Sequence, residues 1–332
     1  MSDPLLLNDW HPVADARALG PGGIGKATLL GRELVLWRSA DGAAHAWEDR
    51  CPHRGSRLSR GRIVDGGIAC AYHGWQFDAT GRCVAVPAHP GMQLLEHFRA
   101  TAHRATERYG LVWACLGEPA GDVLPFPEYD DPNLRKVLCG PYEVESSAPR
   151  IIENFLDMAH FPFVHPGVLG EPGRNEVRDY EVRPFDDGTG WGGVEAIGCF
   201  FWQPQTNSLS HEGTDVEYAY RVPRPLTAIL NKVPEGQDGF REAISLHVQP
   251  VGEEWSVAWI IMAMTNFVQP EEELRAFQDG IFLQDKPIVE NQVPLRLPLA
   301  PRAELPVRAD KLAVAYRRYL REKGLRYGVV PE

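Results

Sequence analysis

The sequence predicts an α+β fold built from two domains. Between residues 8 and 118, short apolar or alternating runs are separated by turn dipeptides, which is typical of a small all-β domain. Residues 119–135 are rich in proline, glycine and acidic residues without periodicity, so we expect a linker there. From 136 to 332, strand-like runs are followed by helical patterns, which predicts an antiparallel sheet packed against helices.

The first domain is expected to begin with a hairpin. The runs ELVLWRS at 33–39 and AAHAWED at 43–49 have strand lengths and flank Asp41-Gly42, a strong hairpin signal. Further strands are predicted in GRIV, IACAYHGWQFD, CVAVPA and ERYGLVWACLG. The glycine-rich GPGGIGKA at 20–27 lacks the strand–turn–helix frame and the ribose-binding acid of a dinucleotide site, so we expect a loop there.

The second domain is expected to begin with a strand and a helix. KVLCGPYEVESSA at 136–148 looks like a strand, and several runs between 176 and 267 predict the rest of a sizeable sheet. IIENFLDMAHFPFVHP at 151–166 predicts a helix. Pro162 clashes with the carbonyl four residues earlier, so this helix should kink or widen there.

Two further helices are predicted near the C-terminus. The first starts at Pro270 and three glutamates, which are the preferred residues of a first helical turn, and Pro287 should kink or break it. The second is an amphipathic pattern in RADKLAVAYRRYLREKG that ends at Gly324. The second domain is therefore a sheet with helices packed on it.

The composition limits the class of partner and the location. A net charge of −11 and a pI near 5.5 describe a surface that repels nucleic-acid phosphates. No run of about eighteen apolar residues is long enough to span a membrane. The N-terminal MSDPLLLNDWHP lacks the basic and apolar regions of a secretory signal, so we expect a cytoplasmic protein.

Six cysteines in 332 residues argue against a disulfide framework. Two of them belong to the metal motif described next. The others are expected to be buried thiols, because they lie in apolar or mixed surroundings: Cys83, Cys115, Cys139 and Cys199.

Two similar ligand pairs lie within residues 51–75. Cys51-x-His53 and Cys70-x-x-His73 are separated by sixteen residues, and each pair contains one thiol and one imidazole. This set matches the two-Cys, two-His ligation of a Rieske [2Fe–2S] cluster. A structural zinc site also uses two cysteines and two histidines, but zinc motifs usually group cysteines with cysteines and histidines with histidines. The mixed pairs therefore favour the cluster.

A second metal site is predicted in the helix at 151–166. Asn154, Asp157 and His160 follow at intervals of three and share one helix face. His165 lies five residues after His160, which a distortion at Pro162 can accommodate. Two histidines in an apolar helix are also compatible with ordinary core residues. Beside a cluster motif, they favour a non-haem iron held by two histidines and one carboxylate.

The long helix at 270–292 offers the carboxylate. Asp279, Asp285 and Glu290 are its candidates. An apolar stripe runs along this helix through Leu274, Phe277, Ile281 and Ile288, and Asp285 lies on it, whereas Asp279 and Glu290 do not. A carboxylate that faces a core requires a cation or metal. We therefore predict Asp285 as the third ligand.

The motifs CPHRG and CAYHGW resemble those of the Rieske non-haem iron oxygenases, and the resemblance extends to the last helix. It implies a Rieske fold for 8–118 and a catalytic domain of the helix-grip (START-like) type for 136–332. The implied cofactors are a [2Fe–2S] cluster and a mononuclear Fe(II). The resemblance also implies an aspartate of the last long helix as the third iron ligand, in agreement with Asp285.

The resemblance implies roles for the two polar residues beside the histidines. Asp157 would link His73 of one chain to His160 of the next, so that electrons pass between subunits of a head-to-tail ring, commonly a homotrimer. The alternative for Asp157 is a helix carboxylate paired with an arginine. Asn154 is expected near the iron, either as a weak ligand or as a neighbour of the ligands.

The resemblance implies the terminal component of a monooxygenase. A separate NAD(P)H-dependent reductase of the flavin and ferredoxin type would supply electrons, because the chain has no flavin or nicotinamide motif. The branch with toluenesulfonate methyl-monooxygenase and the vanillate and dicamba O-demethylases looks most similar. Its reactions are methyl hydroxylation and O- or N-demethylation of small aromatic, often anionic, substrates. Three alternatives are a ring cis-dihydroxylating dioxygenase, a Rieske electron carrier without oxygenase activity, and a non-enzymatic scaffold with zinc in both sites.

The sequence leaves two questions undecided: the role of an arginine cluster and the residues that line the substrate pocket. The arginines at 54, 57, 60 and 62 are compatible with a solvated loop, or with docking of a neighbouring subunit or of an acidic electron donor. Four residues are candidate pocket liners, although such side chains are more often plain core: Phe201, Trp202, Met262 and Met264.

Overall fold

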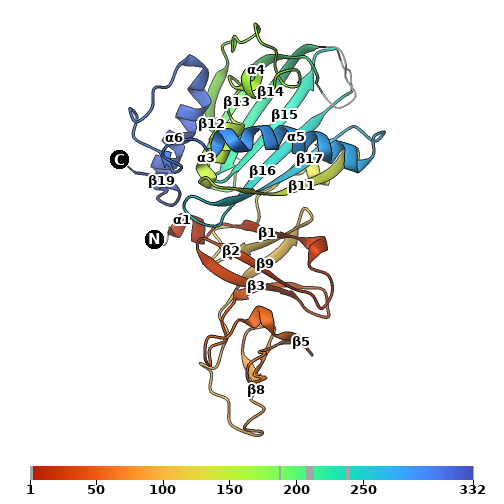
Figure 1. The fold of residues 1–332 in the computed structure, drawn as a ribbon, viewed down its shortest axis with the longest axis vertical. Coiled ribbons are helices and arrows are strands. Elements are labelled where there is room, and N and C mark those ends of the chain that lie inside the picture. Colours follow the sequence, from red (N-terminus) through yellow and green to blue (C-terminus); the bar gives the residue numbers. More distant parts are fainter. Residues whose placement is uncertain (1–2, 187, 207–212, 237–238, 332) are drawn as a thin grey trace. The chain divides into compact units, whose positions relative to one another are not determined.

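A computed structural model of the chain describes residues 3–186, 188–206, 213–236 and 239–331. The chain separates into two compact units between Val123 and Leu124. The first unit is built from strands with short helical turns, and the second is a large antiparallel sheet with helices (Figure 1). The predicted α+β class is confirmed.

The first unit contains two antiparallel sheets. The larger sheet has the strand order β1-β10-β9-β4-β3-β2, and the smaller has the order β5-β6-β7-β8. The larger sheet is formed by β1 (His11–Asp15), β2 (Ile24–Leu29), β3 (Arg32–Arg38), β4 (Ala44–Glu48), β9 (Ala102–Arg108) and β10 (Leu111–Cys115). The smaller is formed by β5 (Arg62–Val64), β6 (Gly67–Ala69), β7 (Gln76–Asp78) and β8 (Cys83–Ala85). Helical turns lie at α1 (Pro4–Leu7), η1 (Ala16–Ala18) and η2 (Leu58–Arg60).

The predicted hairpin joins β3 and β4. Leu34 pairs with Glu48 and Arg38 with Ala44, and Gly42 takes the left-handed conformation that the turn requires, with φ of +91°. The prediction of a loop at 20–27 was wrong in its second half, because β2 already begins at Ile24. The first half is a turn, with no helix following it.

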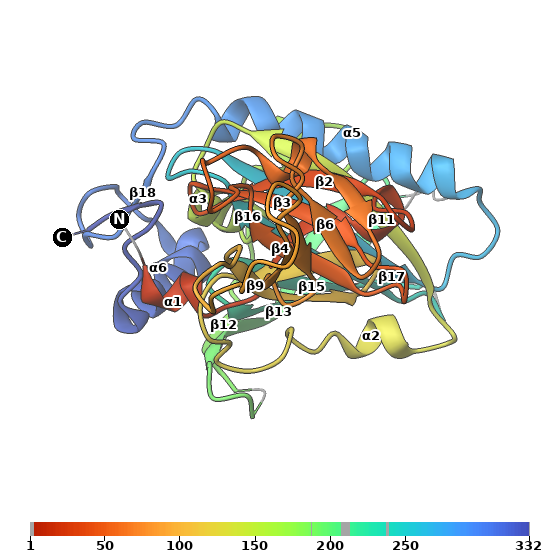
Figure 2. The ribbon, with the colours of Figure 1, turned by 90° about the horizontal axis from the view of Figure 1, so that it is seen from below.

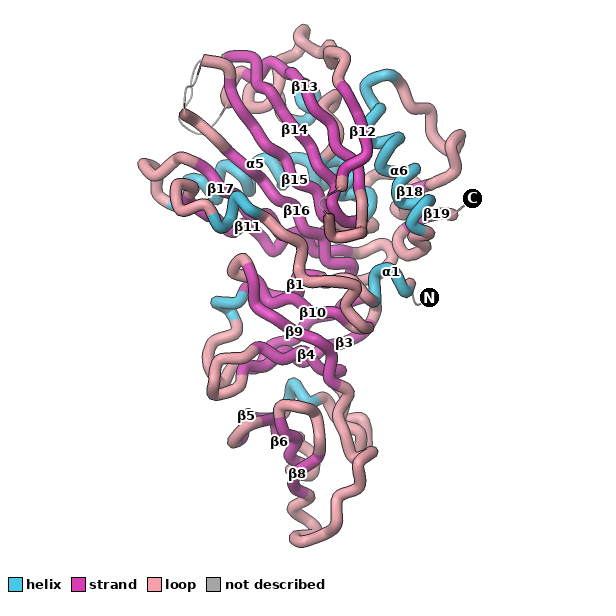
Figure 3. The backbone as a smooth tube through the Cα atoms, turned by 180° about the vertical axis from the view of Figure 1, so that it is seen from behind, coloured by secondary structure: helices cyan, strands magenta, loops and turns pink. Residues whose placement is uncertain are grey.

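The second unit is organised around a seven-stranded sheet. Its order is β11-β17-β16-β15-β14-β13-β12, and every neighbouring pair is antiparallel (Figure 3). The strands are β11 (Arg135–Val144), β12 (Glu181–Phe185), β13 (Gly193–Gln203), β14 (Thr214–Arg224), β15 (Thr227–Pro234), β16 (Glu242–Pro250) and β17 (Ser256–Met264). The sequence patterns predicted each of these strands except β15.

The long helix α5 (Glu271–Val289) lies across one face of this sheet, where it packs against β11 (Figures 1 and 2). On the same face, α3 (Ala148–Phe155) packs against β16. The helix α6 (Lys311–Lys323) packs against β13 and ends at Gly324, which has φ of +74° as predicted. The remaining elements are α2 (Pro127–Asp130), α4 (Phe161–Val164), η3 (Arg308–Asp310), β18 (Leu297–Pro298) and β19 (Val329–Val330).

Two prolines can be compared with their predicted effects on helices. The predicted single helix at 151–166 is two helices, because α3 ends at Phe155 and α4 begins at Phe161. Pro162 therefore occupies the first turn of α4, where its missing N–H has no intrahelical acceptor to lose. Pro287 does not break α5, which continues two residues beyond it to Val289.

Two predictions about composition can be compared with the structure. All six cysteines are free and buried, which confirms the prediction for the four outside the cluster motif. Of the helices within the described ranges, none has both the length and the apolar character needed to cross a lipid bilayer.

Acidification is expected to destabilise the second unit through His247 of β16. This imidazole is fully buried between the hydroxyls of Ser245 and Thr227, and burial lowers its pKa to about 3. An unfolded chain protonates this histidine near pH 6.5, so stability falls as the pH drops below that value. Wild type should lose about 1.4 kcal/mol more than His247→Gln between pH 7.5 and 5.5, measured by urea denaturation. Replacing the exposed His89 should leave the pH dependence unchanged.

Candidate metal centres and substrate pocket

The predicted cluster ligands lie in two turns of the same shape. In the first turn the Gly55 N–H donates to the Cys51 carbonyl at 2.9 Å, and in the second the Gly74 N–H donates to the Cys70 carbonyl at 3.0 Å. Both glycines have φ of +71°, a conformation that glycine adopts without strain. The two turns thus present a cysteine and a histidine each from a closed loop of backbone.

The four side chains gather in like pairs. The thiols of Cys51 and Cys70 lie together in the core below the turns, each 2% exposed. The rings of His53 and His73 lie nearer the surface, with centroids 4.7 Å apart. A two-iron cluster needs this arrangement, because two thiolates bind one iron and two imidazoles bind the other. The donor set therefore fits a [2Fe–2S] cluster.

A single zinc ion fits these four residues less well. A zinc site requires its ligand atoms to converge around one point. Throughout the described ranges, a group of three or more potential metal ligands whose atoms all lie within 4.8 Å of one another occurs once, at His160, His165 and Asp285. The cysteines and histidines of the two turns do not converge in that way.

The protein also surrounds the sulfur of Cys51 with backbone donors. Burial raises the pKa of the Cys51 thiol to about 11, and the neighbouring Cys70 acts in the same direction. Backbone N–H groups of His53 and Arg54 oppose this shift by hydrogen bonding to the sulfur. Such donors stabilise a thiolate and tune the potential of an iron–sulfur cluster.

The four arginines that the sequence analysis singled out are exposed: Arg54, Arg57, Arg60 and Arg62. Arg57 forms an ion pair with Glu33 at the surface. This is compatible with both sequence-based alternatives, a solvated loop and a docking surface.

The predicted iron ligands lie at the ends of short elements. His160 is the residue before α4 and His165 is the residue after it, so the four-residue helix sets their separation. Asp285 lies on α5 and faces them, 16% exposed, while His165 is completely buried. The structure therefore brings the three predicted ligands together from segments far apart in sequence.

The three ligand atoms form a compact triangle. His160 Nε2 lies 3.2 Å from His165 Nε2, and Asp285 Oδ1 lies 3.3 Å and 3.0 Å from these two nitrogens. One face of an octahedron with metal–ligand bonds of about 2.1 Å has edges of about 3.0 Å. Two imidazoles and one carboxylate on a single face are the ligand set of non-haem iron oxygenases, so the donor set fits Fe(II).

Hydrogen bonds between the imidazoles and the carboxylates shift the pKa values of His160 and Asp285 against the effect of burial. Burial alone would lower the pKa of His160, but hydrogen bonds to Asp157 and Asp285 raise it to about 9. Burial would likewise raise the pKa of Asp285, but hydrogen bonds from His160 and His165 lower it. The Asp285 carboxylate is therefore ionised and pairs with a protonated His160, and a metal ion would displace that proton.

Two acceptors fix which nitrogen of each imidazole points at the site. His160 Nδ1 donates to Asp157 Oδ2 at 3.1 Å, and His165 Nδ1 donates to Gln284 Oε1 at 2.8 Å. Both Nε2 atoms are thereby directed towards Asp285. The sequence patterns did not indicate Gln284, although its position directly before Asp285 is a usable signal.

Replacing Gln284 by leucine is expected to weaken Fe(II) binding about 10- to 100-fold, because His165 loses the acceptor that orients its ring. Gln284→Glu keeps an acceptor oxygen and should retain most of the affinity. Iron titration of the metal-free protein measures both variants. Equal affinity in Gln284→Leu and wild type would show that the hydrogen bond does not support the site.

The other polar candidates of this region bind either Asp285 itself or partners away from the triangle. Asn154 Nδ2 donates to Asp285 Oδ1 at 3.4 Å. Asp279 accepts a hydrogen bond from the Tyr142 hydroxyl at 2.5 Å, and Glu290 accepts one from the Lys286 ammonium at 2.7 Å. The alternatives to Asp285 on α5 are thus paired elsewhere.

A largely apolar pocket opens beside the triangle. It holds about 790 Å³ of space between atoms, part of it open to solvent. The sheet contributes one face of β14–β17, and α5 contributes the opposite wall. The lining includes His160, His165, Asp285, Asn154, Tyr218, Tyr220, Lys232, Glu242, Ile244, Leu246, Ile260, Met262, Phe277, Gln278, Ile281 and Phe282.

Predictions about pocket residues were only partly right. Met262 lines the pocket, whereas Phe201, Trp202 and Met264 are not among its lining residues. Phe201 packs edge-on against Phe161 in the core, and Trp202 lies under the guanidinium of Arg174.

The predicted apolar stripe of α5 also differs from the observed one. Phe277 and Ile281 line the pocket, but Ile288 is 46% exposed. The buried positions of this helix share only Leu274 with the predicted stripe: Leu274, Gln278, Phe282 and Val289.

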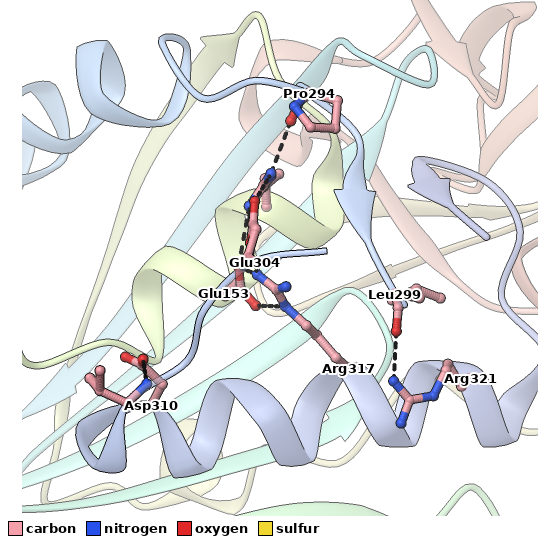
Figure 4. A network of polar contacts seen from close by, with 9 residues as sticks. Glu153, Pro294, Leu299, Glu304, Asp310, Arg317 and Arg321 are labelled. Carbon is pink, nitrogen blue, oxygen red and sulfur yellow. Dashed lines mark hydrogen bonds and ion pairs between the residues drawn. The ribbon is translucent and has the colours of Figure 1, made fainter. Parts of the chain in front are cut away.

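Asp157 faces a second hollow, of about 1050 Å³, on the side of α6. Its Oδ1 accepts the Ala159 N–H at 2.8 Å, and its side chain is 32% exposed. Beside it, Arg317 of α6 binds Glu153 of α3 at 2.7 Å and also pairs with Glu304 (Figure 4). This network fixes the end of α3 while leaving Asp157 accessible.

The chain matches two protein-family models. Residues 9–99 match the Rieske [2Fe-2S] domain, and residues 144–326 match the vanillate O-demethylase oxygenase C-terminal domain. The first match contains both cysteine–histidine turns, and the second contains His160, His165 and Asp285.

Known relatives cover most of the chain. The probable methylxanthine N7-demethylase NdmC of Pseudomonas sp. (strain TJI-51) is 42% identical over 66% of this chain and 77% of its own. The methylxanthine N1-demethylase NdmA of Pseudomonas putida is 30% identical over 96% and 89%. The structure of NdmA with caffeine has a TM-score of 0.83 over 96% of this chain and 91% of its own, at 29% identity. A putative toluene-4-sulfonate monooxygenase iron-sulfur subunit of Comamonas testosteroni is 28% identical over 92% and 93%.

Proposed function

This chain belongs to the Rieske non-haem iron oxygenases, and we propose that it removes a methyl group from nitrogen of a small aromatic heterocycle. It is the oxygenase component of a monooxygenase, with a [2Fe–2S] cluster and a mononuclear iron as cofactors. The observation that carries the proposal is the apolar pocket beside the His160, His165 and Asp285 triangle. The named activities of the relatives, methylxanthine N-demethylation among them, support nitrogen as the atom that bears the methyl group.

We assign the cofactors to the residues whose donor sets fit them. Cys51, His53, Cys70 and His73 would hold the cluster. His160, His165 and Asp285 would hold the mononuclear iron, which supplies activation of O₂ and transfer of one oxygen atom to a methyl C–H bond. The other oxygen atom leaves as water with two electrons and two protons. The N-hydroxymethyl product then loses formaldehyde and leaves an N–H.

The remaining residues of the site orient the proposed iron ligands and enclose the substrate. Asp157 and Gln284 keep both imidazole protons on Nδ1, and the Asn154 amide steadies Asp285. The residue Asn154 therefore acts as a positioning residue in this proposal. Apolar side chains of α5 and the sheet exclude water from the methyl group.

Electrons come from a separate protein, and an oxidoreductase is among the relatives. We propose that this donor is an NAD(P)H-dependent reductase of the flavin and ferredoxin type, and that the protein works in the cytoplasm. We further propose a head-to-tail homotrimer, in which His73 of one chain approaches Asp157 of the next. The exposure of Asp157 in the second hollow supports this arrangement.

The proposal is tested by turnover. Protein with two cluster irons, two acid-labile sulfides and one mononuclear iron per chain is supplied with O₂ and a reductase. N-methylated heterocycles should release one formaldehyde for each O₂ consumed. A cis-diol product would indicate the ring dioxygenase instead, and electron transfer without O₂ consumption on any substrate would indicate an electron carrier.

A further inference from the structure

A lysine and a glutamate are buried together in the sheet wall of the pocket. Lys232 of β15 and Glu242 of β16 are direct cross-strand partners. Leu230 and Ile244, two residues along each strand, line the same pocket, as the two-residue period of a strand requires. The side chains of Lys232 and Glu242 are 5% and 11% exposed.

The two charged groups do not satisfy each other. Lys232 Nζ lies 3.9 Å from Glu242 Oε2, which is too far for a hydrogen bond. Within the described part of the chain, neither head has another hydrogen-bond partner. An ammonium has three donors and a carboxylate has four acceptor sites, so both heads keep unused capacity. Burial lowers the pKa of Lys232 and raises that of Glu242, as expected for charges removed from water.

Such a pair is an unusual component of an otherwise apolar pocket. Two buried charges that lack hydrogen bonds destabilise a fold, and apolar residues of similar size would be as stable or more so. A role in binding explains their presence. Because the charges cancel, the pair does not favour an anion: a substrate carboxylate near Lys232 would also approach Glu242.

We propose that Lys232 and Glu242 determine specificity by binding a ring edge in which an N–H lies next to a carbonyl. The carbonyl oxygen accepts from the Lys232 ammonium, and the ring N–H donates to the Glu242 carboxylate. The preferred substrate is therefore an uncharged N-methylated heterocycle with a cyclic amide or imide edge, such as an oxopurine. This inference rests on the proposed function for the chemistry, but it concerns binding and can be tested without turnover.

Two purines provide a matched pair of probes. Theobromine has one ring N–H between two carbonyls, and caffeine carries a methyl group on that nitrogen. Calorimetry on the iron-loaded protein without O₂ should give a dissociation constant at least 10-fold lower for theobromine. A buried polar site discriminates strongly against an analogue that leaves its groups unpaired.

Variants identify the residues responsible. Lys232→Met combined with Glu242→Met should weaken theobromine binding 10- to 100-fold and change caffeine binding less than 3-fold. Glu242→Gln, which keeps an acceptor and the side-chain shape, should retain part of the preference. Lys311→Met removes an ion pair with Asp179 outside the pocket and should have no effect. Circular dichroism and iron content verify that each variant is folded.

Three results would overturn the inference. The first is equal loss of both purines in the double variant, and the second is an unchanged preference for theobromine. The third is a wild type that binds neither purine but binds an aromatic carboxylate through Lys232. By contrast, normal binding preferences without formaldehyde release would contradict the proposed function and leave the binding role intact.

Discussion

Replacing Asp285 by alanine is expected to remove the mononuclear iron and leave the cluster in place. Asp285 Oδ1 lies within 3.0–3.3 Å of both Nε2 atoms, so among the described residues it is the carboxylate that completes the triangle. Loss of a hydrogen bond to a metal ligand weakens metal binding roughly 10- to 100-fold. Loss of a direct ligand should weaken iron binding by more than this. The ratio of iron to acid-labile sulfide should fall from 3:2 towards 2:2, and the visible spectrum of the cluster should stay unchanged.

Asp279→Ala is the matched control, because it removes another carboxylate of α5. Asp279 is bound by the Tyr142 hydroxyl instead of facing the histidines, so iron content should stay at the wild-type level. Full iron occupancy in Asp285→Ala would contradict the assignment and move the third ligand to Asp279 or Glu290.

Replacing Asp157 by asparagine is expected to reduce product formation about 100-fold or more even when excess iron keeps both metals bound, since loss of the His160 acceptor alone weakens iron binding about 10- to 100-fold. Asparagine can still accept the Ala159 N–H through one oxygen, so the turn is preserved. Its NH₂ group then faces the Nδ1–H of His160, and two donors cannot form the hydrogen bond that a carboxylate accepts. In the proposed trimer this breaks the link from cluster to iron.

Single-turnover spectra separate this effect from metal loss. The oxidised cluster should lose its visible absorption normally when reductant is added. The reduced cluster should then reoxidise slowly when O₂ and substrate are added. Asp131→Asn is a matched control, since Asp131 accepts the N–H two residues later in the same way and contacts no imidazole. Unchanged turnover in Asp157→Asn would remove this residue from the electron path.

Much of the architecture was predictable because its signals are local. The two cluster turns are set by short motifs with a glycine that must take positive φ, and the hairpin by Asp41-Gly42. The inward position of Asp285 on α5, facing the two histidines, could be predicted from the apolar residues near it on the same helix. These features depend on a few neighbouring residues, so the sequence contains the whole signal.

The remaining features depend on contacts between distant segments. The break between α3 and α4 could not be distinguished from a kink, because packing decides where a helix ends. The role of Gln284 depends on His165, 119 residues away in the sequence. The role of Lys232 depends on Glu242 of the neighbouring strand. The exposure of Ile288 likewise reflects which side of α5 the fold leaves uncovered.

The proposed iron ligands come from both sides of α4 and from α5, about 120 residues later in the chain. A bound ion therefore works as a removable cross-link across the catalytic half. Binding to the folded form alone adds about 2.7 kcal/mol of stability when free iron is 100-fold above its dissociation constant. When iron is scarce that contribution vanishes, α4 and its flanking turns open more often, and proteases gain access. The lifetime of the enzyme in the cell should then follow its iron supply.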